Sequence, residues 1–362
     1  MSETAPHEVS HGVLDGEAVQ AVDRSSQLQD ILTLPDQLRD ALWRVQAAEL
    51  TRRDAPRGLI VAGMGGSAIG GLLARAVLGD RAQRPIVVAR GYELPAWTTP
   101  ETMVLCSSYS GDTEETLAAY EAAGAVGAHR IVATTGGKLA AAARADRVPV
   151  VPLPGGFQPR AAVAYSLVVV LEAAALCGVS ESLRSEIDVA AAHTEQLIAS
   201  WGPGGAQENS PNSPKELAQG LHGTVPQIAG AGLTSPIAYR WKTQFNENAK
   251  LPAFWNELPE LDHNEIVGWG SARELGPFSA VFLDDVDLHP RVRQRIELTR
   301  GLIAGAGAPT FRLETEGVTP TERLLSLTVL GDLVSVYLAV LRGVDPTPVP
   351  VLDQLKSALA GG

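Results

Sequence analysis

Apolar and polar positions follow two different spacings along the chain, one typical of buried strands and one typical of helices. Between residues 58 and 154, short apolar runs alternate with segments whose apolar residues recur at helical spacing, and glycine-rich turns separate them. Strands are predicted at residues 59–63, 85–90, 102–108, 130–135 and 148–154, and helices at 113–127, 138–145 and from residue 68 onward. Strands that alternate with helices predict a parallel sheet covered on both faces.

A second and shorter alternation follows a segment dense in Gly, Pro, Asn and Ser, which has the composition of a linker. Its strands are predicted at 225–232, 279–285 and 309–315, and its helices at 235–249, 291–305 and 321–343. Upstream of both, residues 1–20 are expected to be unstructured and 28–46 helical with a break at Pro35.

The two alternations predict an α/β protein built from two related domains. The predicted division is an N-terminal lead-in with helices (1–57), a first domain (58–200), a linker (201–215), a second domain (216–342), and a C-terminal tail with a helix (343–362). A length of 362 residues agrees with about two domains.

Composition and charge argue against several classes of protein, among them nucleic-acid-binding, secreted and membrane-spanning proteins. The chain has 29 basic and 41 acidic residues and a formal net charge of −12, which argues against a nucleic-acid or anionic membrane surface. The N-terminus is polar and acidic, unlike a secretory signal. The apolar run at 161–178 contains Glu172 and is shorter than the roughly 20 residues of a membrane span, so it predicts a buried helix. Cys106 and Cys177 lack metal-ligand spacing and are expected to be core residues of a protein in the reducing cytoplasm.

The first glycine-rich turn, in "LIVAGMGGSAIGG" at residues 59–71, has the order strand, turn and helix that can hold an anion. Gly63, Gly65 and Ala68 match the GxGxxA pattern of dinucleotide sites. Such a site needs an acidic residue at the end of the next strand, where this chain has Arg90. An arginine there suits the 2′-phosphate of NADP, so the turn by itself is compatible with a dinucleotide or with a simpler phosphate.

The second informative turn, "CSSYSGDTEET" at residues 106–116, also lies between a strand and a helix. Gly111 allows the backbone to approach a ligand, and four hydroxyl groups lie within seven positions, at Ser107, Ser108, Ser110 and Thr113. Hydroxyls at the positive end of a helix suit one phosphate monoester. The alternative is a capping box formed by Asp112 and Glu115, which explains two of these residues but not the hydroxyls.

Together, "GMGGSAIGG" and "SSYSGDTEET" resemble the sugar isomerase (SIS) domain, a flavodoxin-like α/β unit that binds phosphosugars through its Ser/Thr turn. In the second half, "FNENAKLPAFWNELPELDHNEIVGW" closely resembles the bifunctional phosphoglucose/phosphomannose isomerases, which have two SIS domains. "PGGFQPRAAVAY" at 154–165 and "VLDQLKSAL" near the C-terminus extend the resemblance over nearly the whole chain. The implied fold is two flavodoxin-like SIS domains, each a parallel sheet flanked by helices.

The resemblance implies roles for four residues. Aldose-ketose isomerisation needs a base that moves the C2 proton to C1, groups that open the sugar ring, and a cation beside the enediolate. By resemblance Glu247 is the base, His263 and Lys356 assist ring opening, and Arg160 stabilises the negative charge. Taken singly, each residue has another interpretation. Glu247 is compatible with a solvated glutamate, His263 and Lys356 with surface side chains, and Arg160 with a structural ion pair.

The resemblance also implies the ligand and the assembly. The phosphate of a phosphosugar is expected at Gly66, Ser67, Ser108, Ser110 and Thr113, with no cofactor and no metal. An obligate homodimer is implied, with His263 contributed across the interface. A non-catalytic phosphosugar-binding regulator is the alternative from another class, and it would normally carry a basic DNA-binding helix, which the first 57 residues do not predict.

Two positions depart from the family pattern. Asp112 stands where asparagine is common in the phosphate turn, and we expect it to act as a helix N-cap. Family members that accept both glucose and mannose substrates resemble one another at a threonine before the C-terminal lysine. Here Thr347 lies nine residues before Lys356 among several prolines, so the glucose activity is more strongly implied than the mannose activity.

Overall fold

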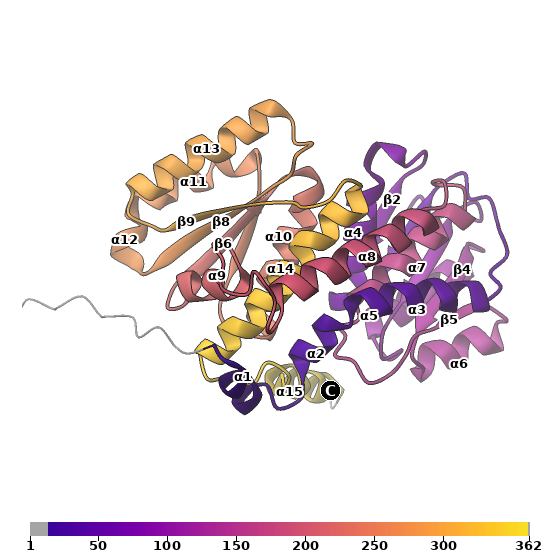
Figure 1. The fold of residues 1–362 in the computed structure, drawn as a ribbon. Coiled ribbons are helices and arrows are strands. Elements are labelled where there is room, and N and C mark those ends of the chain that lie inside the picture. The colour runs from indigo at the N-terminus through magenta and orange to yellow at the C-terminus, as the bar shows by residue number, and fades with distance from the viewer. Residues whose placement is uncertain (1–13, 361–362) are drawn as a thin grey trace, which may run out of the picture.

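The structure is a computed structural model that describes residues 14–360, and it contains two parallel sheets that are each covered by helices (Figure 1). The strand order is β2-β1-β3-β4-β5 in the first sheet and β7-β6-β8-β9 in the second. Every strand pair in both sheets is parallel. The first order is that of flavodoxin-like folds, so the predicted α/β class is confirmed.

The strands are short and follow the apolar runs of the sequence. They are β1 (Leu59–Ala62), β2 (Ile86–Ala89), β3 (Met103–Ser107), β4 (His129–Thr134), β5 (Val150–Pro152), β6 (Val225–Gly230), β7 (Phe254–Glu257), β8 (Phe278–Asp284) and β9 (Thr310–Glu314). The helices are α1 (Gly16–Val22), α2 (Gln27–Leu32), α3 (Leu34–Ala47), α4 (Gly65–Leu78), α5 (Glu114–Ala125), α6 (Gly137–Ala145), α7 (Val163–Leu176), α8 (Arg184–Trp201), α9 (Pro214–Leu221), α10 (Ser235–Glu247), α11 (Glu265–Gly268), α12 (Ala272–Leu275), α13 (Pro290–Gly305), α14 (Pro320–Leu341) and α15 (Pro350–Ala360).

Successive residues of β1 face opposite sides of the first sheet, as the geometry of a strand requires. Leu59 and Val61 belong to the main apolar core, whereas Ile60 and Ala62 pack in a second cluster with side chains of α5 and α6. All four are buried, because helices cover both faces of the sheet. This explains why β1 appears in the sequence as a continuous apolar run.

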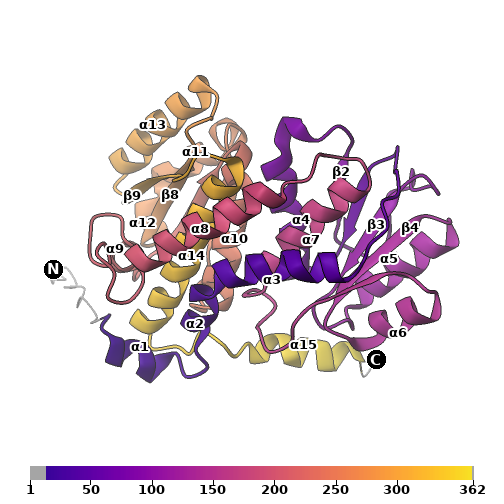
Figure 2. The same cartoon turned by 45° about the vertical axis from the view of Figure 1, so that its right-hand side comes forward.

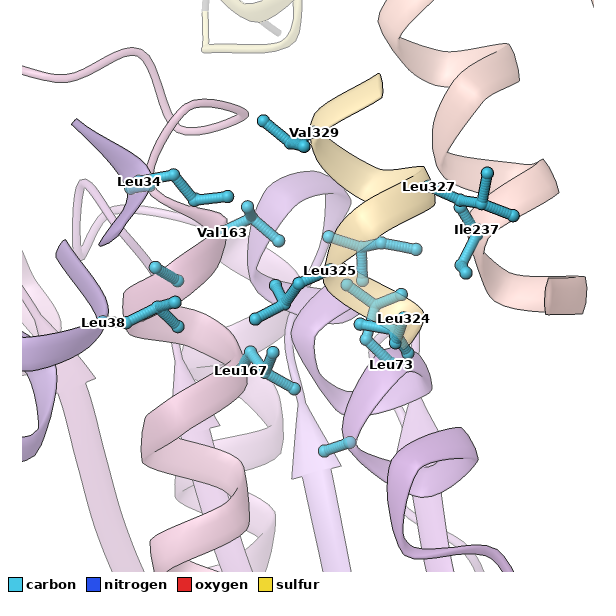
Figure 3. Close-up of a cluster of buried hydrophobic side chains, with 14 of the residues drawn as sticks. Leu34, Leu38, Leu73, Val163, Leu167, Ile237, Leu324, Leu325, Leu327 and Val329 are labelled. Atoms are coloured by element: carbon cyan, nitrogen blue, oxygen red, sulfur yellow. The ribbon is translucent and has the colours of Figure 1, made fainter. Parts of the chain in front are cut away.

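The main apolar core lies between the two sheets and is formed largely by side chains of the helices that separate them. Figure 3 shows side chains of α3, α4, α7, α10 and α14 gathered there. Its labelled members include Leu38, Leu73, Leu167, Ile237 and Leu325. The core therefore joins the two sheets into one packed body, and it fixes the positions of α4 and α10, which carry residues of the candidate site.

Helix α14 crosses the middle of the molecule (Figure 2). By length and composition it could cross a membrane, but 94% of its most apolar window is buried inside the structure. The apolar run at 161–178 forms the buried helix α7, as expected. Helix α14 is longer than α7 and is also almost wholly buried. An apolar helix enclosed by other helices is typical of a protein core.

Three sequence expectations are wrong in detail. Residues 16–22 form α1, where Asp15 caps the first turn by accepting a hydrogen bond from the amide of Ala18 at 2.8 Å, so the expected unstructured segment is shorter than 1–20. Pro35 lies inside the first turn of α3, where its missing N–H costs no helical hydrogen bond, and the helices separate at Thr33. The strand β7 was not predicted, because it is an edge strand with mostly exposed residues.

Both cysteines are buried and free, as predicted, with Cys106 on β3 and Cys177 at the end of α7. The part of the N-terminus numbered 1–13 lies outside the described residues, and so do residues 361–362.

Candidate active site

The hydroxyl-rich turn after β3 lies next to the glycine-rich turn after β1, because these two strands are paired in the centre of the first sheet. Thr113 is the N-cap of α5, and its hydroxyl lies 2.8 Å from that of Ser108. The amide of Gly111 donates to the Ser108 hydroxyl at 3.1 Å, and that of Asp112 donates to the Ser110 hydroxyl at 3.3 Å. The turn is thus held by its own hydroxyl groups at a helix N-terminus, an arrangement suited to an anion.

Gly111 is required by the close packing of this turn against the start of α6. Its φ is +76°, and a Cβ atom there would lie 1.9 Å from the carbonyl oxygen of Gly136. The carboxylate of Asp112 accepts a hydrogen bond from the amide of Lys138 at 3.1 Å, in the first turn of α6. The expectation that Asp112 caps α5 is therefore wrong, because its carboxylate caps the neighbouring helix from outside.

The first glycine-rich turn brings the loop that carries Arg160 close to the start of α4. A Cβ atom on Gly66 would lie 2.6 Å from the carbonyl oxygen of Pro159, so only glycine allows this approach. Ser67 is buried in the same turn, and its carbonyl oxygen accepts a hydrogen bond from Ser166 at 3.0 Å. Gly66 thus connects the predicted phosphate site with the predicted catalytic arginine.

Arg160 and Glu247 are in contact although 87 positions separate them in the sequence. The Nη1 of Arg160 donates to a carboxylate oxygen of Glu247 at 3.2 Å, and its Nε donates to the side-chain oxygen of Asn248 at 2.6 Å. The Arg160 side chain is 4% exposed and that of Glu247 34% exposed. Burial lowers the pKa of Arg160, while the neighbouring Glu247 carboxylate raises it. The carboxylate therefore has a fixed cation on one side and access from solvent on the other.

The segment between α14 and α15 passes over the same arginine. The Nη2 of Arg160 donates to the carbonyl oxygens of Pro346 at 2.8 Å and Thr347 at 2.9 Å. The side chain of Lys250 also donates to the Pro346 carbonyl, at 2.8 Å. The hydroxyl of Thr347 is buried and has no hydrogen-bond partner within residues 14–360. The structure therefore brings Thr347 to Arg160, which the prolines around it left open in the sequence.

A buried polar network supports the arginine from behind. Asp332 on α14 accepts hydrogen bonds from Arg240 at 2.6 and 3.0 Å and from Gln244 at 3.0 Å. Arg240 also donates to the carbonyl oxygen of Arg160 at 2.9 Å. The side chains of Arg240 and Asp332 are 1% and 4% exposed, so each depends on the other for compensation of its charge.

Sequence reasoning missed this network and the lysine beside the base. The side chains of Arg240 and Gln244 on α10 and of its C-cap residue Asn248 lie one turn apart, and they make a polar stripe beside the apolar residues at 237, 241 and 245. Such a stripe on the buried side of a helix was the available signal. Its partner, Asp332, could not be inferred because it lies on another helix far along the chain.

His263 and Lys356 do not join this cluster within one chain. His263 is exposed at the end of a 3₁₀ turn, Glu260–His263. Lys356 is exposed on α15, which lies at the margin of the molecule in both views (Figures 1 and 2). Arg90, the residue that the dinucleotide interpretation would place at the 2′-phosphate of NADP, is stacked on the ring of Tyr239, 5.6 Å from its centre. Of the four predicted catalytic residues, the single chain brings together Arg160 and Glu247.

In the second sheet, the residue that follows strand β8 belongs to a buried ion pair. At the end of β8, the buried carboxylate of Asp285 accepts hydrogen bonds from Arg323 at 2.9 Å and from Thr315 at 2.7 Å. An arginine–carboxylate pair thus follows β8, whereas a hydroxyl-rich turn follows β3 in the first sheet.

Within residues 14–360 no group of three or more His, Cys, Asp or Glu side chains is placed to hold a metal ion. Metal-independent turnover stays a prediction, to be tested with a chelator.

Comparison with known proteins places this geometry in a family. Residues 210–359 match the family described as the bacterial phospho-glucose isomerase C-terminal SIS domain. The bifunctional phosphoglucose/phosphomannose isomerase of Caldicellulosiruptor bescii is 40% identical over 336 residues, which cover 92% of this chain and 98% of that protein. The chain belongs to the bifunctional phosphoglucose/phosphomannose isomerase family. Another family member, from Aquifex aeolicus, is 35% identical over 88% of this chain and 94% of its own. The resemblance seen in the sequence is confirmed.

Solved structures agree with the fold. A hypothetical protein from Thermus thermophilus superimposes with a TM-score of 0.71, at 16% identity, over 95% of this chain and 93% of its own. The C-terminal domain of a glucosamine-fructose-6-phosphate aminotransferase from Francisella tularensis gives 0.68, at 13% identity, over 88% and 96%. Together with the family match, these similarities confirm two SIS-type α/β units.

Proposed function

We propose that the protein is an aldose-ketose isomerase that interconverts glucose 6-phosphate, and also mannose 6-phosphate, with fructose 6-phosphate through an enediol. The observation that carries the proposal is the contact of Arg160 with the Glu247 carboxylate, where the loop that carries Arg160 lies against Gly66 of the first glycine-rich turn. Membership of the isomerase family supports the same substrates.

The chemistry follows from a partly exposed carboxylate with an adjacent cation. Glu247 removes the proton at C2 of the open-chain aldose, and the electrons of that C–H bond form the C1–C2 double bond of the enediolate. Arg160 stabilises the negative charge on oxygen, an effect that is large where water is excluded. Return of the proton to C1, while O1 gains a proton and O2 loses one, gives the ketose. His263 and Lys356 would assist the proton transfers of ring opening.

The test is a coupled assay on the purified protein with each of the three sugar phosphates, with and without a chelator. Turnover that survives the chelator is expected. A folded protein that turns over none of the three sugars would sink the proposal, and tight binding without turnover would favour a regulatory role.

Thr347 bears on the mannose substrate. The backbone carbonyl oxygen of Thr347 accepts a hydrogen bond from Arg160 at 2.9 Å, so this residue lies at the candidate active site. This placement supports acceptance of both C2 epimers, which the resemblance associates with a threonine in this region.

The phosphate turn leads to a prediction about binding. We expect Ser110→Ala to raise KM severalfold and to leave kcat nearly unchanged, because the phosphate keeps its charge through the reaction and its binding is uniform. Steady-state kinetics with fructose 6-phosphate measure both constants. Ser182→Ala, at an exposed position between α7 and α8, is the matched control. A fall in kcat with unchanged KM would argue against a phosphate site at this turn.

We further propose a homodimer in which His263 of one chain completes the site of the other. Exposed apolar side chains on β7 and α11, two elements that contact the Glu260–His263 turn, support this interface, since Phe254 and Val267 are 57% and 81% exposed. Patches of this kind usually mark contact surfaces.

Complementation tests the shared site. Glu247→Gln and His263→Ala chains are each expected to be nearly inactive, but co-expressed chains should form mixed dimers with one intact site each. Random pairing in a two-fold dimer predicts about a quarter of the wild-type activity. Activity no higher than that of the two single variants would show that His263 does not cross the interface.

A further inference from the structure

The side chain of Lys250 lies beside the base, and the mechanism above gives it no role. Lys250 follows the end of α10 by three residues and has a φ of +51°, which turns the chain back on itself. Its ammonium group donates to the carbonyl oxygen of Glu247 at 2.5 Å and to that of Pro346 at 2.8 Å. One side chain thus connects the residue that carries the base with the segment 342–349, here called the C-terminal strap.

Two further cations hold the strap to the same place. Arg160 donates to the carbonyl of Pro346 that Lys250 also contacts, and to the next carbonyl along the strap. Arg342 donates in the other direction, to the carbonyl oxygen of Ala249 at 2.8 Å. The end of α10 and the strap are therefore joined by three cationic side chains, and Lys250 is the one that contacts both the Glu247 backbone and the strap.

Burial and the neighbouring charges bring the pKa of the Lys250 ammonium group into an accessible range. Burial, and after it the positive charge of Arg160, lower this pKa to about 8 against the opposing carboxylates of Asp345 and Glu247. The guanidinium group of Arg342 lies near the backbone of the same residue, 3.5 Å from the Lys250 carbonyl oxygen. Above this pKa the group loses its charge and one of its three N–H donors.

We propose that Lys250 is a positioning residue for the isomerisation: its ammonium group holds the strap against the end of α10 and so fixes Glu247 relative to Arg160. The proposal rests on the proposed function, because it assigns Lys250 a part in that same site. Small displacements of a catalytic group cost much rate, so loss of this contact should act on kcat rather than on substrate binding.

The kinetic test compares wild type, Lys250→Met and Lys250→Arg with fructose 6-phosphate between pH 6 and pH 10. Lys250→Met is expected to lower kcat by roughly 10- to 100-fold with little change in KM. Lys250→Arg should recover most of the activity and move the alkaline fall in kcat to higher pH, because guanidinium stays charged. Lys242→Met, at a partly exposed position on α10, is the matched control and should behave as wild type. A Lys250→Met enzyme with wild-type kcat, or an alkaline fall that does not move in Lys250→Arg, would overturn the proposal.

Hydrogen exchange measured by mass spectrometry on the strap gives a readout that needs no turnover. In Lys250→Met, and in wild type above pH 8 after correction for the intrinsic rate, amides of 342–349 should exchange faster. Unchanged exchange in both would overturn the role of Lys250 even in an active enzyme. Absence of turnover in the wild type would instead contradict the proposed function alone. If Lys250→Met does not fold, the arginine variant and the pH dependence of the wild type still decide the matter.

Discussion

Replacement of Glu247 by glutamine is expected to lower kcat by ~10² to 10⁴-fold or more, while KM for the phosphosugar changes little. The amide keeps the shape of the side chain, and its oxygen can still accept the hydrogen bond from Arg160 that spans 3.2 Å. What it loses is the capacity to take the C2 proton, which only the transition state requires.

The coupled assay measures this loss directly. Glu121→Gln, at an exposed position on α5, is the matched control and should keep wild-type kinetics. A Glu247→Gln enzyme whose kcat lies within a few-fold of wild type would mean that another group is the base.

The second large effect concerns stability. Replacement of Asp332 by alanine should lower the free energy of unfolding by ~3 to 5 kcal/mol, because the buried guanidinium of Arg240 is left without a counter-charge. Gln244 loses its acceptor as well. Since Arg240 also holds the carbonyl oxygen of Arg160, the site should loosen together with the fold.

Urea unfolding followed by circular dichroism measures this change. The control is Glu195→Ala, which removes an ion pair with Arg39 whose side chains are 62% and 42% exposed. Exposed pairs contribute only ~0 to 1 kcal/mol, so this variant should unfold almost as wild type does. If Asp332→Ala proves no more destabilised than Glu195→Ala, the buried pair does not support the core as described.

Much of the fold was predictable because its signals are local. β1 is enclosed on both faces, so its apolar run identifies it without knowledge of its neighbours. β7 gave no such signal, because an edge strand packs little of its surface and its residues 254–257 are mostly exposed. α1 was missed because short polar helices depend on caps such as Asp15 more than on apolar spacing.

The site shows the same division between local and distant information. The hydroxyl turn could be inferred from the sequence, since Ser108, Gly111 and Thr113 act on one another within six positions. The side chain of Asp112 was assigned to the wrong helix, because its carboxylate accepts a hydrogen bond from the backbone amide of Lys138 on α6. The pairing of Arg160 with Glu247 came only from family resemblance, because no local pattern links residues so far apart.

The most direct test of the enediol mechanism is solvent isotope incorporation during conversion of fructose 6-phosphate in D₂O. The proton that Glu247 removes from C1 can exchange with solvent before its return, so the glucose and mannose 6-phosphate products should carry deuterium at C2. In Glu247→Gln this incorporation should fall together with turnover. Products without deuterium, or incorporation by Glu247→Gln at the wild-type rate, would contradict proton transfer through this carboxylate.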